Sequence, residues 1–242
     1  MALLDRLKHS FVDFFFPPQC VGCRSWGSLL CPSCLKTLPW LPSPFCPRCG
    51  LPLSPGQPCP DCPGTPWAID AIRSLFIMEG TAREAVHALK YHGLRSLAAP
   101  LGQLLREYLQ SRPLPAEVLV PVPLHPRRER WRGFNQAALL AREVGKLSRW
   151  PVVEGSLLRY RDSPPQVHAR AQERRRNVQG AFRLSDMSLV GKRVLLIDDV
   201  CTTGATLDAC ARTLKDGGAL SVWGLTLARE PMSGVATRGR RA

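Results

Sequence analysis

The chain has 242 residues, of which 33 are Lys or Arg and 19 are Asp or Glu, so its formal net charge is +14. This length suits one medium-sized domain and a smaller one, and an apolar content of 45% argues against a disordered chain. No run of about 18 uncharged apolar residues occurs, which excludes a membrane-spanning helix. Residues 3–16 carry too many charges for a secretory leader, and we therefore expect a cytoplasmic protein.

Residues 3–16 are predicted to form a short amphipathic helix, because their apolar side chains recur at helical spacing. We favour packing of this helix on the main domain. Attachment to a membrane surface is the alternative, and stable membrane insertion is not expected.

Cysteine pairs follow. Eight of the ten cysteines form four pairs of identical internal spacing, Cys20/Cys23, Cys31/Cys34, Cys46/Cys49 and Cys59/Cys62. In a chain without an export signal, such pairs indicate metal ligation rather than disulfides. Four thiolates complete the tetrahedral shell of Zn²⁺ and leave no open position, so we predict two structural zinc sites.

The pairs could be shared between the two ions in two ways. Sequential use, with the first two pairs on one ion and the last two on the other, needs only short hairpins and is preferred. A cross-braced arrangement stays possible. Thirteen of the 23 prolines lie in residues 1–66, where they exclude long helices and central strands. Metal binding would then supply much of the folding free energy of this region.

Residues 67–232 are predicted to form a second domain of alternating strands and helices, and residues 233–242 a flexible tail. Strands are expected over 70–78, 117–122, 193–200 and 219–227, and helices over 81–91, 97–111, 134–148 and 204–216. Helices between apolar strands indicate an α/β fold with a mostly parallel sheet covered on both faces.

Residues 194–206 (VLLIDDVCTTGAT) are the chemical centre of the chain. An apolar strand ends in Asp198 and Asp199, and a Thr/Gly loop then opens a helix. Ligands of open parallel sheets bind beyond the carboxyl ends of the strands. Free backbone N–H groups, threonine hydroxyls and a helix N-terminus form an anion cradle, while the acids can accept hydrogen bonds from sugar hydroxyls. This combination suits a sugar phosphate. The alternative is a solvated turn with N-capping threonines.

The segment VLLIDDVCTTGAT closely resembles the phosphoribosyl pyrophosphate (PRPP) signature of type I phosphoribosyltransferases. The whole chain resembles the ComF family, which joins a double zinc ribbon to such a domain and is associated with DNA uptake in natural transformation. Four further segments carry this resemblance, in the family's order: FPPQCVGC (16–23), ALKYHG (88–93), PVPLHPRRERWRGFNQA (121–137) and RRRNVQGAF (174–182).

The resemblance implies a fold and a set of roles. The fold is a type I phosphoribosyltransferase-like parallel sheet flanked by helices and preceded by the double zinc ribbon. Asp198 and Asp199 would bind the ribose hydroxyls of PRPP, with Mg²⁺ accompanying the substrate. The 5′-phosphate would be wrapped by Cys201, Thr202, Thr203, Gly204, Ala205 and Thr206. The Cys201 thiol occupies a variable position in the signature and is not expected to react.

A basic stretch follows the second predicted strand. The segment from His125 to Arg183 contains 14 Lys and Arg residues and five Asp and Glu residues, which gives it a net charge of +9. In type I phosphoribosyltransferases the loop after the first strand of the core, which here is the predicted strand over 117–122, contacts pyrophosphate. The resemblance therefore assigns pyrophosphate binding to Leu124, His125, Arg130 and Arg132. A solvated basic face is the alternative for the arginines further along the chain.

Residues 159–177 suit a hood loop that closes over PRPP and excludes water. The resemblance assigns Gln166, Arg174 and Asn177 to this loop. Lys90 and Tyr91 lie in a matching segment, where an ordinary helix end is an equally good explanation.

Three functions fit the sequence. The first is an active PRPP-dependent phosphoribosyltransferase with an unknown acceptor. The second is a single-stranded-DNA-binding competence factor, with DNA-uptake proteins as partners, in which the arginine-rich domain would hold phosphates. The third is a PRPP sensor without turnover.

Overall fold

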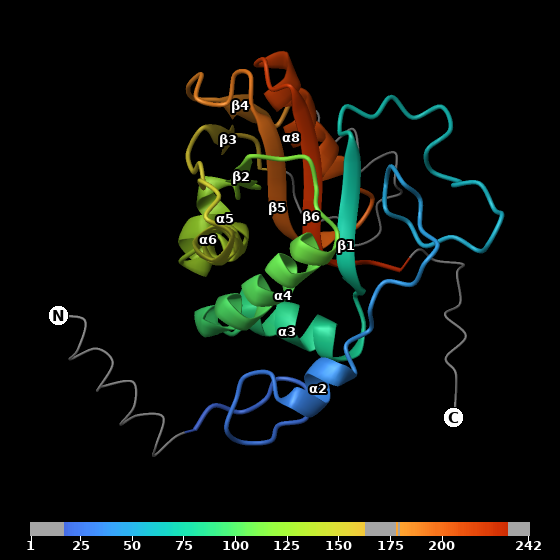
Figure 1. Cartoon of the computed structure of the whole chain (residues 1–242). Coiled ribbons are helices and arrows are strands. Elements are labelled where there is room, and N and C mark those ends of the chain that lie inside the picture. The colour runs from blue at the N-terminus through green and yellow to red at the C-terminus, as the bar shows by residue number, and fades with distance from the viewer. Residues whose placement is uncertain (1–16, 163–177, 179, 232–242) are drawn as a thin grey trace.

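A computed structural model describes residues 17–162, 178 and 180–231 (Figure 1). The predicted N-terminal helix, the hood-loop residues Gln166, Arg174 and Asn177, and the predicted tail all lie outside the described residues. Within the described ranges, no helix has both the length and the apolar character that a membrane span requires.

The centre of the molecule is a four-stranded parallel sheet with the strand order β1-β6-β5-β2. The strands are β1 (Ala71–Ile77), β2 (Val118–Pro121), β5 (Arg193–Cys201) and β6 (Ser221–Arg229). All four were predicted from apolar runs, and their bounds differ from the prediction by no more than two residues. Most residues of each run are apolar because helices cover both faces of the sheet, so both sets of alternating side chains are buried.

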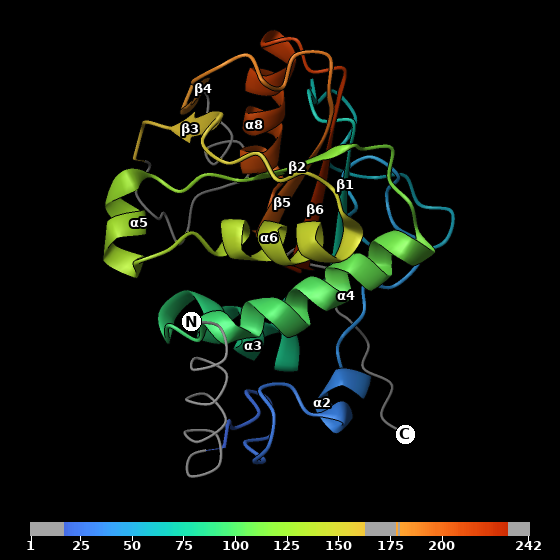
Figure 2. The same ribbon diagram turned by 60° about the vertical axis from the view of Figure 1, so that its left-hand side comes forward.

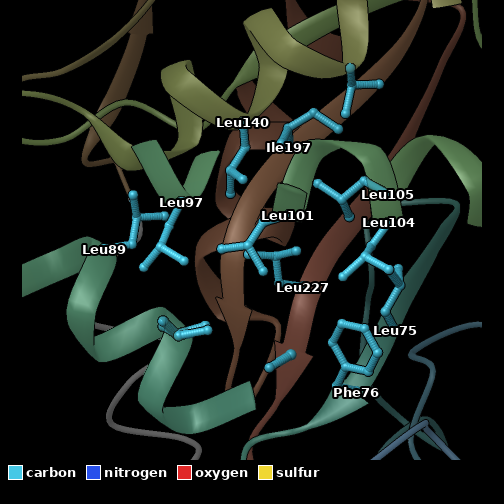
Figure 3. Close-up of a cluster of buried hydrophobic side chains, with 14 of the residues drawn as sticks. Leu75, Phe76, Leu89, Leu97, Leu101, Leu104, Leu105, Leu140, Ile197 and Leu227 are labelled. Atoms are coloured by element: carbon cyan, nitrogen blue, oxygen red, sulfur yellow. The ribbon is translucent and has the colours of Figure 1, made fainter. Parts of the chain in front are cut away.

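In the described part of the chain, three helices cover one face of the sheet and one covers the other (Figures 1 and 2). The first group is α3 (Gly80–Tyr91), α4 (Ala98–Ser111, preceded by the 3₁₀ turn Arg95–Leu97) and α6 (Gln136–Ser148); the helix on the other face is α8 (Ala205–Asp216). Figure 3 shows how Leu89, Leu101 and Leu140 meet strand residues such as Ile197 and Leu227. The predicted α/β architecture is therefore confirmed.

Four short elements were not predicted: α2 (Pro32–Lys36), α5 (Pro126–Arg132), and the antiparallel pair β3 (Leu157–Arg159) and β4 (Phe182–Leu184). Their few residues give no usable periodicity. End signals define α5 instead: His125 Nδ1 accepts the Arg127 N–H at 3.3 Å, Pro126 occupies the first turn, and Gly133 ends the helix at φ 80°.

The cysteine-rich segment is hydrogen-bonded along β1, which is an edge strand. The Leu41 N–H donates to Leu75 O at 2.7 Å, the Ile77 N–H donates to Pro39 O at 2.8 Å, and the Ile72 N–H donates to Arg48 O at 2.7 Å. These bonds cover an edge that would otherwise expose unpaired backbone groups. The segment shares its core with the sheet, and the boundary at residue 66 stays a prediction.

Candidate functional site

The loops after β2 and β5 leave the sheet in opposite directions. The chain continues from β2 to α6 on one face and from β5 to α8 on the other, so the two adjacent strands form a topological switch point. Open parallel sheets bind ligands in the crevice at such a point. The predicted sugar-phosphate loop and the predicted pyrophosphate loop therefore lie at neighbouring strand ends.

The β5–α8 loop forms the turn that the sequence predicts. Thr202, Thr203 and Thr206 are partly exposed. Within the described residues, the backbone N–H groups of these three threonines make no hydrogen bond. They lie at the start of a twelve-residue helix, where unpaired N–H groups attract anions.

Gly204 is required for two reasons. Its φ is +77°, a left-handed conformation that L side chains rarely adopt, and an added Cβ would lie 2.8 Å from Ile72 Cδ1 and 3.1 Å from the Trp67 ring. The glycine therefore serves the packing of the loop floor.

The two acids point in different directions, because consecutive strand residues face opposite sides of a sheet. Asp199 is 3% exposed, and its Oδ1 pairs with Lys90 Nζ at 3.0 Å. Its Oδ2 is buried and has no hydrogen-bond partner among the described residues. Burial would lower the pKa of Lys90, but the adjacent carboxylate outweighs this effect and raises that pKa. Lys90 is thus a charged member of the site.

Asp198 turns its carboxylate back to the chain, where Oδ1 accepts the Asp199 N–H at 2.9 Å. Burial, together with the charge of Asp199, raises the pKa of Asp198 to about 7. The charge of Arg159 on β3 opposes this rise. Arg159 was predicted to begin the hood loop (159–177), but it is the last residue of β3. The strand was missed because it has only three residues and joins the site through tertiary packing.

The structure separates the four predicted pyrophosphate residues. Leu124 and His125 follow β2 directly, and Arg130 is exposed on α5 with no ion pair among the described residues. Arg132 instead stacks on Tyr91, with its guanidinium 5.5 Å from the ring centroid, and hydrogen-bonds to Gln136 Oε1. Arg132 is therefore held against α3 and α6.

Other members of the same motif shape the turn between α5 and α6. Asn135 caps α6 by accepting the Ala137 N–H at 3.0 Å, and its Nδ2 donates to Val122 O at 3.0 Å. Arg95 donates to Gly133 O at 3.0 Å. These bonds fix the loop that follows β2.

A cavity of about 680 Å³ opens beside this loop. Its walls include Leu124 and His125 from the β2 loop, and Arg159, Tyr160 and Arg183 from the β3–β4 pair. Its size is typical of a small-molecule pocket, and the basic side chains along it suit a phosphorylated ligand.

Burial decides the role of the two remaining cysteines. It raises the pKa of the Cys201 thiol, and it raises that of Cys210 further. Thiols that stay protonated are poor nucleophiles, which agrees with the expectation that Cys201 does not react.

The eight paired cysteines form two clusters, which we call the first cluster (Cys20, Cys23, Cys31 and Cys34) and the second cluster (Cys46, Cys49, Cys59 and Cys62). In each, the four Sγ atoms lie within 4.8 Å of one another. Ligand use is therefore sequential, and the cross-braced alternative is wrong. The closest Sγ pairs are 3.5–3.6 Å apart, near the ~3.8 Å expected between thiolates of a tetrahedral Zn²⁺ site. The residues present therefore fit zinc.

Two family models match the chain. A double zinc ribbon domain matches residues 11–63, and a phosphoribosyl transferase domain matches residues 133–238. The two models follow each other in the order that the cysteine pairs and the VLLIDDVCTTGAT loop predict.

The chain is also similar to named proteins. It is 34% identical to DNA utilization protein YhgH of Salmonella typhi, covering 85% of this chain and 94% of that protein. It is 31% identical to competence protein F of Haemophilus influenzae, covering 88% and 99%. Among solved structures, glutamine PRPP amidotransferase from B. subtilis is similar with a TM-score of 0.40 and 16% identity, covering 58% of this chain and 30% of that one.

Proposed function

This chain belongs to the ComF family, in which a double zinc ribbon precedes a phosphoribosyltransferase domain, and from that premise we propose that it uses PRPP with Mg²⁺. The phosphoribosyl group would pass to an acceptor with release of pyrophosphate. Its relatives are named for competence and DNA utilization, and we propose a corresponding role for this chain.

The observation that carries the proposal is the state of Asp199. A buried carboxylate oxygen without a partner is costly, and such groups are normally hydrogen-bonded. Among the described residues, Asp199 Oδ2 lacks a partner next to a loop in which the backbone N–H groups of Thr202, Thr203 and Thr206 lack acceptors. A molecule that carries hydroxyls and a phosphate would satisfy both groups at once.

The chain's own residues have distinct tasks in this reaction. Asp199 and Asp198 accept hydrogen bonds from the ribose hydroxyls, and the loop from Cys201 to Thr206 holds the 5′-phosphate. The bond between C1 of the ribose and the pyrophosphate oxygen breaks, the electron pair leaves with pyrophosphate, and the acceptor forms the new bond at C1. Mg²⁺ would offset charge on the phosphates when bound. Arg130 would do the same from the protein side, and His125 would hydrogen-bond to the phosphate oxygens.

Two further parts complete the proposal. Gln166, Arg174 and Asn177 would close over the substrate and exclude water. Each cysteine cluster would bind one Zn²⁺ in a purely structural role, because four thiolates leave no position for a reacting molecule.

Calorimetric titration of the full chain with PRPP and Mg²⁺ tests the proposal. Asp199→Asn should weaken binding at least about tenfold, because an amide cannot replace a charged acceptor and disturbs the pair with Lys90. Glu117→Gln, a half-buried acid at the opposite end of the sheet, is the matched control. Unchanged affinity in Asp199→Asn would refute the assigned site.

Pyrophosphate release in the presence of nucleobases and amines then separates enzyme from sensor. Release with one acceptor, abolished by Asp198→Asn, supports transfer. Tight PRPP binding without release under any acceptor supports a sensor.

One observation favours single-stranded DNA as a second ligand. Trp131 is 74% exposed on the arginine-rich helix α5, and exposed aromatic rings among arginines are typical stacking platforms for bases. Trp131→Ala should weaken oligonucleotide binding several-fold in fluorescence anisotropy. Trp26→Ala removes a comparably exposed ring, 64% exposed, from the ribbon and should have no effect. Equal effects would remove the support for this second function.

A further inference from the structure

Arg229 is a buried arginine that touches both halves of the molecule. It is the last residue of β6 and is 2% exposed. Its Nη1 donates to Cys49 O at 2.6 Å and to Cys201 Sγ at 3.2 Å. Cys49 belongs to the second cluster, and Cys201 begins the loop that we assign to PRPP. One guanidinium thus joins a metal-ligand knuckle to the substrate loop.

The charge of Arg229 has no carboxylate partner. None of the ion pairs among the described residues includes it, and its Nε is buried without a hydrogen-bond partner there. An uncompensated buried cation is strongly unfavourable. A counter-charge is therefore required close to Cys49.

A loaded second cluster supplies that counter-charge. Four thiolates and one Zn²⁺ carry a net charge of −2, and metal-bound thiolates depend on neighbouring groups of opposite charge. A second guanidinium, Arg73, lies against the same knuckle and donates to Pro47 O at 2.8 Å. By contrast, no lysine or arginine side chain hydrogen-bonds to the first cluster in the part of the chain that the structure describes. The two clusters therefore differ in their electrostatic surroundings.

The contact with Cys201 transmits this dependence to the loop. The Cys201 carbonyl accepts the Glu230 N–H at 3.0 Å, so both the backbone and the thiol of Cys201 are fixed by the end of β6. The loop floor is made by Ile72 and Trp67, and Ile72 is bonded in turn to Arg48 of the same knuckle.

We propose that Arg229 is the counter-charge of the second zinc centre and a positioning residue for the substrate loop, so that zinc in the second cluster, but not in the first, controls PRPP affinity. The part that concerns PRPP rests on the proposed function. The part that concerns zinc does not.

The test uses the full zinc-loaded chain and two readouts. The first is zinc release to a competing chelator, with native mass spectrometry counting ions per chain. The second is PRPP–Mg²⁺ affinity by calorimetry. Arg229→Met should speed release of one zinc of the two by about 10-fold or more and weaken PRPP binding by a similar factor. A merely structural loss would affect both zinc ions equally.

Three variants define the controls. Arg229→Lys keeps the positive charge but loses the planar guanidinium with its several N–H donors. It should retain zinc better than Arg229→Met does, with a smaller gain in PRPP affinity. It also replaces Arg229→Met in the test if that variant does not fold. Cys201→Ala should weaken PRPP binding with both zinc ions retained. Arg193→Met, an exposed arginine at the start of β5, should change neither readout.

The outcomes separate the two proposals. If Arg229→Met retains both zinc ions as tightly as the unmodified chain, the counter-charge role is refuted. If zinc release speeds up but PRPP affinity is unchanged, the coupling is refuted. If the unmodified chain does not bind PRPP, the proposed function fails, and the zinc readout alone still decides the role of Arg229.

Discussion

The first and second cysteine clusters have the same ligands and the same internal spacing, but they are attached to the molecule differently. The first cluster lies against the start of α3: an added Cβ at Gly22 would lie 2.8 Å from Cys34 Sγ and 3.0 Å from Thr81 Oγ1. The second cluster lies along β1, where Arg48 accepts a backbone bond from Ile72. Each cluster has two buried cysteines, Cys20 and Cys34 in the first and Cys46 and Cys49 in the second. Cys46 and Cys49 belong to the hydrophobic core that contains α8.

Their distances from the candidate site differ accordingly. The second cluster is one arginine away from the loop after β5. Within the described residues, the first cluster is linked to the site along α3, which begins beside it and carries Lys90 near its other end, roughly 15 Å away at 1.5 Å per helical residue. The spacing of the cysteines determines which metal a cluster suits, whereas the packing of the cluster determines which other parts of the molecule depend on that metal.

The sharpest test of this comparison removes one cysteine pair at a time. Cys46→Ser with Cys49→Ser should cost about 5 kcal/mol or more, because it removes a metal site and leaves polar groups in the core. Cys20→Ser with Cys23→Ser should cost about 2 kcal/mol, since that cluster is peripheral. Urea unfolding followed by tryptophan fluorescence measures both, with zinc counted per chain. Equal costs would contradict the comparison.

Lys90→Met tests the path along α3. It leaves the buried Asp199 without its counter-ion, which should cost about 4 kcal/mol and weaken PRPP binding. Lys215→Met is the control: its pair with Asp70 is also short, at 2.6 Å, but both side chains are about one-third exposed, so the cost should stay below about 1 kcal/mol. If loss of the first cluster weakens PRPP binding as much as Lys90→Met does, α3 transmits more than we infer.

Gly204→Ala tests the loop floor that the second cluster supports. We expect a cost of about 3 kcal/mol, from the left-handed backbone and the clash with Ile72 and Trp67. Gly191→Ala has a similar φ, +68°, with open space around its Cβ, so it should cost only about 1 kcal/mol. Thermal or urea unfolding of both variants gives the free-energy cost of each substitution, and the difference is the contribution of the clash with Ile72 and Trp67. Equal costs would show that these two side chains move aside for the added Cβ.

The smallest expected effect has the opposite sign. The raised pKa of Asp198, about 7, means that the protonated form favours the fold. The stabilising contribution of protonated Asp198 is fully present below the unfolded-state pKa near 3.8, and it is lost as the pH rises to about 7. Asp198→Asn should therefore stabilise the ligand-free chain at pH 8 by about 1–2 kcal/mol after allowance for solvent screening, and have little effect at pH 4.

Asp186→Asn is a control of opposite sign. Hydrogen bonds from Ser188 and Ser156 lower the pKa of Asp186 to about 2, so its stabilising contribution is present above pH 3.8 and is lost as the pH falls toward 2. Unfolding at pH 8 should show a loss for Asp186→Asn and a gain for Asp198→Asn. A loss of stability in both variants would contradict the inference that charged Asp198 destabilises the fold.

Much of the fold was predictable because its elements are long and apolar. The four sheet strands and the helices α3, α4, α6 and α8 have clear periodicity or continuous apolar runs. The elements that were missed, α5 and the β3–β4 pair, have three to seven residues, too few to show a period. They are defined by caps and by pairing across a long stretch of chain.

The candidate site divides in the same way. The acids, the Thr/Gly loop and the cysteine spacing are local patterns, and each was found where the chemistry of its residue types requires it. The pairing of Lys90 with Asp199 and the contact of Arg229 with Cys201 join residues far apart in the chain. Lys90 was noticed only because its segment resembles the family, with an ordinary helix end as an equal explanation, and no pattern marked Arg229, because an arginine at a strand end is ordinary.

The sequence by itself determined the α/β class, the eight cysteines of the two clusters and the strand–loop–helix course of the chain after β5, since spacing and apolar pattern act over a few residues. Only the tertiary structure decided that cysteine pairs are used in sequence, that Lys90 pairs with Asp199, and that a buried arginine lies between a cluster and the loop. Those facts depend on which surfaces pack together, and packing is set by the whole chain at once.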